Sequence, residues 1–451
     1  MEQTAWEKLR DTQTVMDYCD KYMGFLNAGK TERLCTNAAK KLAGEAGFVN
    51  IDTCKTLKPG DKVYRVNRGK NLILARIGSG DILNGVNLVA SHIDSPRIDL
   101  KPNPLYEEQH IALWKTHYYG GIKKYQWTAI PLSLIGVVVL ENGETVDICI
   151  GEKADDPVFT ITDLLPHLAA DQMSKKMTEA FTGEDLNALA GSMPYDCEKD
   201  KCRETVLKLL KEAYGIEEAD FVSAELELVP ANPARSVGLD RSMVGAYGQD
   251  DRVCAFTALT SLLDAKKTER TQVCYLADKE EIGSIGNTGM KSRFFENFLA
   301  ELAYKCRGDY NDLYLRKLLT GSACLSADVC NAVDPTYASV SELKNAGFLG
   351  GGLAICKYTG ARGKSSTSDA NAEFVAKIRR IFNSAGIAWQ MAELGKVDQG
   401  GGGTVAQFIA NLDVDTLDCG VPVLSMHAPF EVTSKADVYT AYLGYRAFYQ
   451  S

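Results

Sequence analysis

Side chains that can bind metal ions follow five apolar or turn-forming segments of this sequence. Acids directly after a buried strand are costly unless they are paired or bind a cation. The residues concerned are His92 and Asp94 in "LVASHID", Asp250 and Asp251 in "GQDDR", Asp278, Glu280 and Glu281 in "YLADKEE", Asp328 in "LSADV" and His427 in "VLSMHAP". Ligands of α/β sheets bind at the carboxyl ends of the strands, so we expect these segments to converge on one site.

Two imidazoles and several carboxylates, without thiolates, form a donor set for borderline or hard divalent ions. A bridging carboxylate can hold two such ions ~3.5–4 Å apart, which is the arrangement of aminopeptidases and phosphatases. Of two adjacent glutamates, one can bind a metal while the other carries a proton from water to the leaving amine. The donor set therefore predicts a two-metal hydrolase, and it leaves the division of work between Glu280 and Glu281 open.

Each segment also has an ordinary structural explanation. Asp250 and Asp251 alone are equally well explained as the cap of a helix, and Asp328 as a cap or turn. Glu280 and Glu281 alone are better explained as a solvated turn. Three isolated histidines are expected to make ordinary hydrogen bonds and stay outside the metal set: His110, His117 and His167. The metal hypothesis rests on the coincidence of all five segments.

Composition and charge exclude several classes of function. The chain has 451 residues, 45% of them hydrophobic, which suffices for two globular domains of ordinary size. A net charge of −9 and the lack of a long basic run argue against nucleic acid or an anionic membrane as partner. No apolar stretch has the length of a signal peptide or membrane span, and the 13 scattered cysteines are typical of a reducing compartment. We therefore expect a cytoplasmic protein. The close pair Cys197 and Cys202 lacks a second pair at zinc-finger spacing and is not expected to bind metal.

Helices and strands alternate around these residues. Apolar spacing predicts two helices in the first fifty residues, and apolar runs predict three strands between residues 62 and 91. A helix at about 251–266 and a strand at 272–276 follow later in the chain. This alternation predicts an α/β fold whose sheet is covered by helices on both faces.

The middle of the chain has a different character. Two β runs flank Asn142-Gly143, which is a strong hairpin signal. We therefore expect a catalytic domain made of residues 1–99 and 238–451, with a mostly β domain inserted at 100–237.

The five segments together resemble the aspartyl aminopeptidase family, metallopeptidase family 18. The motifs that carry this resemblance are "SHIDSPRIDLKPNPLYE" at 91–107, "DDR" at 250–252, "DKEEIGS" at 278–284, "SADV" at 326–329 and "SMHAPFEVTSKAD" at 425–437. They span nearly the whole chain. The resemblance implies a co-catalytic zinc exopeptidase fold, an inserted domain for dimerisation or for covering the site, and a tetrahedral dodecamer built from dimers.

The resemblance also implies a role for each site residue. It implies these metal ligands: His92 and Asp328 on one ion, Glu281 and His427 on the other, and Asp250 as the bridge between them. Glu280 would be the general base, and Asp94 would orient the imidazole of His92. The peptide bond between Asp250 and Asp251 is a candidate for the rare cis form.

Substrate-binding residues are implied with departures from the family pattern. Lys357 in "AICKYTG" would meet an acidic substrate side chain, "GGGGT" at 400–404 would allow close backbone approach, and His167 would reach a neighbouring subunit's site. Asn331 and Asp171 stand where eukaryotic relatives have histidines, and both changes alter the charge around the first substrate pocket. A preference broader than N-terminal Asp or Glu, extending to neutral or basic residues, is therefore a second expectation.

The expected function is a metal-dependent aminopeptidase that removes single N-terminal residues from peptides. Two divalent ions are expected, zinc first, with cobalt or manganese as alternatives. Two other functions stay open at this point: a related binuclear amidohydrolase acting on a small-molecule amide, and a non-catalytic self-assembling scaffold. Asp278 receives no role.

Overall fold

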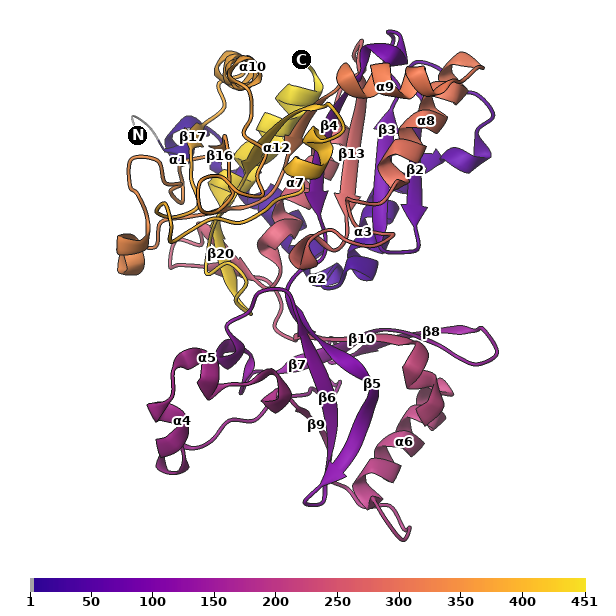
Figure 1. Ribbon diagram of the computed structural model, residues 1–451, viewed down its shortest axis with the longest axis vertical. Coiled ribbons are helices and arrows are strands. Elements are labelled where there is room, and N and C mark those ends of the chain that lie inside the picture. Colours follow the sequence, from indigo (N-terminus) through magenta and orange to yellow (C-terminus); the bar gives the residue numbers. More distant parts are fainter. Residues whose placement is uncertain (1–3) are drawn as a thin grey trace. The chain divides into compact units, whose positions relative to one another are not determined.

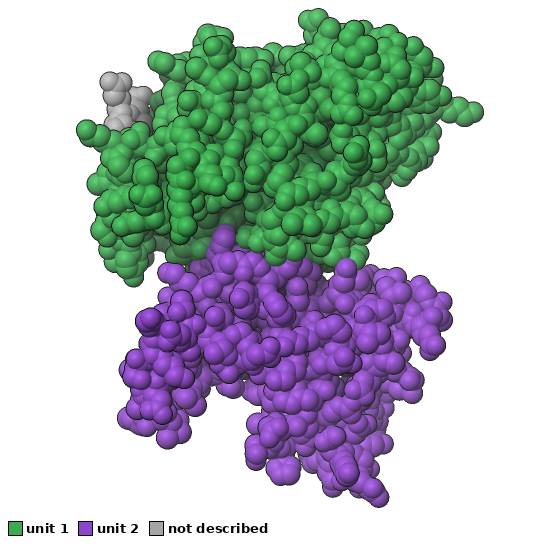
Figure 2. Space-filling view, viewed as in Figure 1, with its two compact units in different colours: residues 1–94, 234–426, 430–451 green, residues 95–233, 427–429 purple. Residues whose placement is uncertain are grey.

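The chain forms two compact units. The computed structural model describes residues 4–451 (Figure 1). The first unit comprises residues 4–94, 234–426 and 430–451, and the second comprises residues 95–233 and 427–429; Figure 2 colours the two separately.

A nine-stranded sheet forms the centre of the first unit. Its order is β1-β2-β3-β13-β4-β14-β18-β16-β17. The strands are β1 (Val49–Asn50), β2 (Lys62–Asn67), β3 (Asn71–Arg76), β4 (Val86–His92), β13 (Thr271–Ala277), β14 (Ala323–Ser326), β16 (Leu353–Cys356), β17 (Trp389–Met391) and β18 (Asp415–Gly420). β13, β4, β14 and β18 are parallel neighbours, whereas β3 and β16 run antiparallel to them. The carboxyl ends of four central strands therefore meet at one edge of the sheet.

Helices cover both faces of this sheet. Successive residues of β3 alternate between two cores, with Leu72 and Leu74 in one and Ile73 and Ala75 in the other. The first core includes residues of α2 (Thr12–Ala28), α3 (Glu32–Glu45), α7 (Gln249–Asp264), α10 (Ala372–Ser384) and α12 (Lys435–Tyr449). The second includes residues of α8 (Phe294–Arg307), α9 (Asp312–Thr320) and α11 (Ala406–Ala410). The predicted α/β fold with helices on both faces is confirmed (Figure 1).

The first unit contains a second, smaller sheet, one strand of which directly precedes α7 in the chain. Its order is β11-β12-β20-β19-β15. The strands are β11 (Arg235–Val237), β12 (Met243–Ala246), β15 (Cys330–Asn331), β19 (Pro422–Leu424) and β20 (Glu431–Ser434), and the short helix α1 (Ala5–Lys8) belongs to the same unit. β12 pairs with β20 and is followed directly by α7. This sheet therefore determines where α7 begins.

The second unit is built on a six-stranded antiparallel sheet. Its order is β8-β7-β10-β5-β6-β9. Its elements are β5 (Arg97–Glu108), β6 (Ile111–Tyr119), β7 (Leu132–Val139), β8 (Thr145–Ile150), β9 (Ala188–Gly191), β10 (Ala224–Pro230), α4 (Ala170–Ser174), α5 (Met177–Ala180) and α6 (Lys201–Tyr214). The hairpin predicted at Asn142-Gly143 is confirmed: it joins β7 to β8, and Gly143 has a φ of +85° that favours glycine.

The cysteines are free thiols, and most of them are buried. This agrees with the prediction that they act as small core side chains. Within residues 4–451, every helix is too short or too polar to cross a bilayer.

Asp437 at the start of α12 makes part of the fold's stability depend on pH. It accepts the backbone N–H groups of Gly350 and Gly352 at 2.6 and 2.7 Å, but burial raises its pKa to about 7. The pKa of an aspartate in the unfolded chain is ~3.9. At pH values between the two pKa values, Asp437 is therefore protonated in the folded chain and ionised in the unfolded chain. Stability from this group is therefore complete below the unfolded pKa and is lost as the pH rises through the folded one.

Asp437→Asn should flatten this dependence. Between pH 5 and 8, the unfolding free energy of the variant should fall by roughly 2 kcal/mol less than that of the natural chain. Urea titrations of both proteins at the two pH values measure the difference. Equal falls in both proteins would contradict the prediction.

Candidate metal centre

The predicted site residues follow the strands whose carboxyl ends meet at one edge of the main sheet. His92 ends β4 and pairs with Ala277, which ends β13. Glu280 and Glu281 follow β13 in a single 3₁₀ turn. Asp328 follows β14, which pairs with β4 on its other side. Parallel pairing thus brings three separate segments of the chain to one place.

The start of α7 supplies two more carboxylates, Asp250 and Asp251. Both side chains are buried, and the peptide bond between them is cis, as the resemblance implied. The backbone N–H of Asp250 donates to Oε2 of Glu431 at 3.0 Å. Oδ2 of Asp251 accepts from the backbone N–H of His92 at 3.2 Å. Contacts to both sheets of the first unit therefore hold the two aspartates.

Ligand atoms form two groups around His92. One group is His92, Asp251 and Asp328, and the other is His92, Asp250 and Glu281; the ligand atoms of each lie within 4.8 Å of one another. Nε2 of His92 is 3.2 Å from Oδ1 of Asp250 and 3.8 Å from Oδ1 of Asp328. Four of the five predicted metal ligands therefore lie together, and Asp251 joins them.

Asp251 is a residue to which the sequence assigned no metal. Its side chain is fully buried, and burial followed by the charge of Asp328 raises its pKa well above the usual range. Its Oδ1 has no hydrogen-bond partner among residues 4–451. The doubled aspartate is the only signal of this role in the sequence. The backbone path into α7 decides which neighbours each of the two aspartates contacts.

Asp94 connects two of the strand ends. Its Oδ1 lies 3.3 Å from Nδ1 of His92 and accepts from the backbone N–H of Glu280 at 3.1 Å. Its Oδ2 accepts from the backbone N–H of Glu281 at 3.2 Å. Nδ1 of His92 also lies 3.0 Å from the backbone carbonyl oxygen of Asp94. One buried residue thus orients the imidazole, and its carboxylate holds the turn that carries both glutamates.

The centre is crowded with negative charge. Burial disfavours an imidazolium at His92, but hydrogen bonds to Asp250, Asp328 and Asp94 outweigh it and raise the pKa of His92 well above its usual value. A divalent cation would take the place of that proton and relieve the repulsion between the carboxylates. A buried imidazole among carboxylates, together with the unsatisfied oxygen of Asp251, fits a borderline or hard divalent ion such as zinc.

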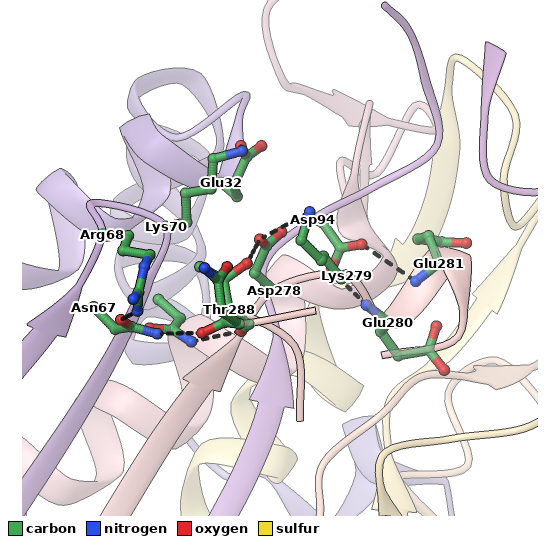
Figure 3. A network of polar contacts seen from close by, with 12 residues as sticks. Glu32, Asn67, Arg68, Lys70, Asp94, Asp278, Lys279, Glu280, Glu281 and Thr288 are labelled. Carbon is green, nitrogen blue, oxygen red and sulfur yellow. Dashed lines mark hydrogen bonds and ion pairs between the residues drawn. The ribbon is translucent and has the colours of Figure 1, made fainter. Parts of the chain in front are cut away.

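Glu280 belongs to neither group of ligand atoms. Burial raises its pKa to about 8; His92 opposes this rise, and the nearby carboxylates, Asp328 first, add to it. In Figure 3 the side chains of Glu280 and Glu281 extend away from Asp94, to which their backbone N–H groups donate. A carboxyl group that titrates near neutrality, beside the ligands but not among them, suits proton transfer.

Four other predicted site residues lie outside both groups of ligand atoms. His427 falls in the second unit, where its Nδ1 is 2.7 Å from a backbone carbonyl oxygen of that unit. His167 and Asp171 are exposed residues of the second unit. Lys357 follows β16, and its Nζ lies 3.5 Å from Oδ1 of Asp369. Their roles in binding metal or substrate stay predictions.

Sequence and structure comparisons identify relatives over nearly the whole chain. The family model described as "Aminopeptidase I zinc metalloprotease (M18)" matches residues 25–449. A probable M18 family aminopeptidase 1 of Clostridium acetobutylicum is 50% identical over 98% of this chain and 97% of its own, and one of Borreliella burgdorferi is 48% identical over 99% of each.

Solved structures give the same result. An M18-family aminopeptidase of Thermotoga maritima superposes with a TM-score of 0.97 at 48% identity, covering 99% of both chains. The fold extends to a more distant structure, the mApe1 dodecamer of S. cerevisiae, with a TM-score of 0.78 at 20% identity over 96% of each chain. With its strand-end ligand groups and this match over residues 25–449, the chain belongs to the M18 family of zinc metalloproteases and is a metallo-aminopeptidase.

Proposed function

We propose that the chain hydrolyses the first peptide bond of a substrate with two divalent metal ions held around His92. The observation that carries this proposal is the pair of ligand groups that share His92. His92 and Asp328 would hold one ion and Glu281 and His427 the other. Asp250 would bridge them, which is supported by its place between His92 and Glu281.

The division of work among the side chains follows from their positions. When bound, two divalent ions supply Lewis acidity and lower the pKa of a water molecule. Glu280 would take the proton from the attacking water and deliver it to the leaving amine. Asp94 would keep the imidazole of His92 and the backbone of Glu280 in place during this transfer. Asp251, held by the backbone of His92, would complete the ligand shell beside Asp328.

A panel of aminoacyl p-nitroanilides with Asp, Glu, Leu, Lys and Arg tests this function. The enzyme is first treated with a chelator and then reloaded with zinc, cobalt or manganese separately. Hydrolysis of free-amine substrates and none of their N-acetylated forms is expected of an aminopeptidase. Cleavage of blocked substrates alone would contradict the proposal.

The proposed preference is broader than acidic N-terminal residues. Lys357 would attract an acidic substrate side chain, but Asp369 accompanies it at 3.5 Å and also pairs with Lys364 at 2.8 Å. The lysine's charge is therefore already partly compensated. The acid at Asp171 and the uncharged Asn331 act in the same direction, because neither supplies positive charge.

Asp369→Asn should shift the preference toward acidic substrates. The ratio of kcat/KM for Asp over Leu substrates should rise up to about fivefold, the size of one exposed ion pair. The matched control is the same substitution in a Lys357→Met background, where the ratio should not change. A change of equal size in both backgrounds would show that Asp369 does not act through Lys357.

We further propose that the protein is a homo-oligomer of dimers in the cytoplasm. The second unit exposes a run of apolar side chains, including Leu168 at 69% and Met173 at 74%, which a monomer would leave in water. The distant relative solved as a dodecamer supports the proposed assembly. The free cysteines support the proposed cytoplasmic location, because disulfides are rare in a reducing compartment. Light scattering of the purified protein measures the assembly, and a monomer would contradict it.

A further inference from the structure

Glu280 and Glu281 lie on a loop whose two ends are buried. The loop leaves β13 at Asp278 and returns at Gly289, and these two residues form a β-bridge. Asp278 and Thr288 are each 2% exposed, whereas the outer part of the loop faces solvent. The position of the two glutamates therefore depends on how the buried ends are held.

One side-chain hydrogen bond closes the base of this loop. Oγ1 of Thr288 donates to Oδ2 of Asp278 at 2.5 Å. The chain is tightly packed beside this closure, since a Cβ atom on Gly289 would lie 2.4 Å from the carbonyl oxygen of Ser284. The bond between Asp278 and Thr288 thus acts together with the β-bridge to hold the two ends close to each other.

Two asparagines of the main sheet hold the returning end. Nδ2 of Asn71, at the start of β3, donates to the carbonyl oxygen of Thr288 at 2.6 Å. Nδ2 of Asn67, at the end of β2, donates to that of Asn287 at 2.8 Å. Both asparagines are buried. The returning end is therefore tied to β2 and β3, and the side chain of Asp278 ties the outgoing end to it.

Asp94 holds the loop at a second place. Its two carboxylate oxygens accept the N–H groups of Glu280 and Glu281 at 3.1 and 3.2 Å. Figure 3 shows the contacts of Asn67, Thr288 and Asp278 on one side of Asp94 and the two glutamates on the other. A shift of about 1 Å at the base would carry both N–H groups beyond hydrogen-bond range. It would displace the glutamate side chains with them.

Charged groups surround Asp278 without removing its role as an acceptor. Lys70 pairs with the buried Glu32 at 3.3 Å. Burial raises the pKa of Asp278 to about 7; Glu32 and Asp94 raise it further, while Thr288 and Lys70 lower it. Whether ionised or neutral, the carboxyl group keeps an oxygen that accepts from Thr288. Asparagine can supply the same acceptor, and alanine cannot.

We propose that Asp278 is a positioning residue for peptide hydrolysis, which closes the loop through Thr288 and so places Glu280 for proton transfer and Glu281 for metal binding. It acts through the loop and not on the substrate. The inference rests on the roles proposed above for the two glutamates.

Four substitutions test it on the assembled, zinc-loaded enzyme. Asp278→Ala and Thr288→Val remove the bond, whereas Asp278→Asn and Thr288→Ser keep it. The measurements are kcat and KM on the p-nitroanilide that is cleaved fastest, and zinc affinity by competition with a chelating dye without substrate. The first pair should lose about 10- to 100-fold in kcat and in zinc affinity, the range for residues that support metal ligands, with KM within about twofold. The conservative pair should stay within about threefold of the natural enzyme. Asp278→Ala also removes the ion pair of Asp278 with Lys279 at 4.0 Å. The double variant Asp278→Ala/Thr288→Val should therefore be no worse than Asp278→Ala alone, because the hydrogen bond to Thr288 is already lost there.

Asp437→Ala is the matched control. Asp437 is also fully buried and also ties two chain segments together, but it lies outside the loop and the metal centre. It should lower the melting temperature and leave kcat per folded molecule and zinc affinity unchanged. The proposed positioning role of Asp278 would be overturned by either of two results. One is that Asp437→Ala lowers kcat and zinc affinity as much as Asp278→Ala does. The other is that Asp278→Asn loses as much kcat and zinc affinity as Asp278→Ala. Should Asp278→Ala not fold, Thr288→Val removes the same bond with little change of shape and decides alone.

Glu280→Gln and Glu281→Gln distinguish the roles proposed for the two glutamates from the positioning role proposed for Asp278. If these variants were harmless, the roles proposed for the glutamates would fail, whatever the loop variants do. If they were damaging and the loop variants were not, the positioning by Asp278 alone would fail.

Discussion

Glu280→Gln should lower kcat by about 10²–10⁴-fold while leaving the metal content unchanged, because it removes the general base and no metal ligand. The glutamine has the same size and can occupy the same place, but it cannot take a proton from water. Glu280 belongs to neither group of ligand atoms, so metal binding should survive the substitution. Steady-state kinetics and elemental analysis of the same preparation measure the two quantities.

Glu281→Gln is the matched comparison, because the neighbouring residue sits on the same turn and also donates its backbone N–H to Asp94. It should weaken metal binding as well as activity, since Glu281 is one of the grouped ligand residues. Equal metal loss in both variants would contradict the assignment of Glu281, and not Glu280, as the metal ligand. More than a few per cent of activity in Glu280→Gln would contradict the role of Glu280 as general base.

Removal of the metal ions should abolish activity and lower thermal stability together. Without cations, four carboxylates around His92 repel one another: the buried Asp250 and Asp251 and the partly buried Asp328 and Glu281. A cation that binds only the folded chain adds about 2.7 kcal/mol at a free concentration of one hundred times its Kd. The apoenzyme should therefore melt at a lower temperature than the zinc-loaded enzyme.

Adding zinc, cobalt or manganese back should restore both activity and melting temperature. Magnesium should restore neither, because it prefers octahedral oxygen coordination and keeps several waters. Calorimetry and kinetics on the chelated enzyme, before and after each addition, check this. Full activity of a demonstrably metal-free enzyme would refute the metal-dependent mechanism.

Much of the catalytic unit could be predicted from local patterns. The continuous apolar runs of β3 and β4 indicate a sheet that is buried on both faces, because successive strand residues point to opposite sides. The doubled glutamate after β13 and the aspartate after β14 mark strand ends, where α/β sheets bind ligands. Side-chain chemistry at those ends indicates metal ions without reference to any tertiary contact.

Other features depended on contacts between distant residues. Asp251 joins Asp328 because α7 begins beside β4, and neither its spacing nor its type distinguishes it from Asp250. The ion pair of Lys357 with Asp369 changes a charge that the motif alone would leave available to a substrate. Loops bring such residues together through backbone paths that no periodicity encodes.

The sequence by itself determined the donor set, the order of strands and helices along the chain and the doubled glutamate, since side-chain chemistry and apolar periodicity are local properties. Only the tertiary structure decided which carboxylates share His92 and how the loop that carries both glutamates is closed. Asp278 illustrates the difference: in the sequence it is one more acid after a strand, and in the structure it is bonded to Thr288 and forms the base of the loop. Such roles depend on strand register and on the return path of the chain, which are set by many weak contacts between residues far apart in sequence.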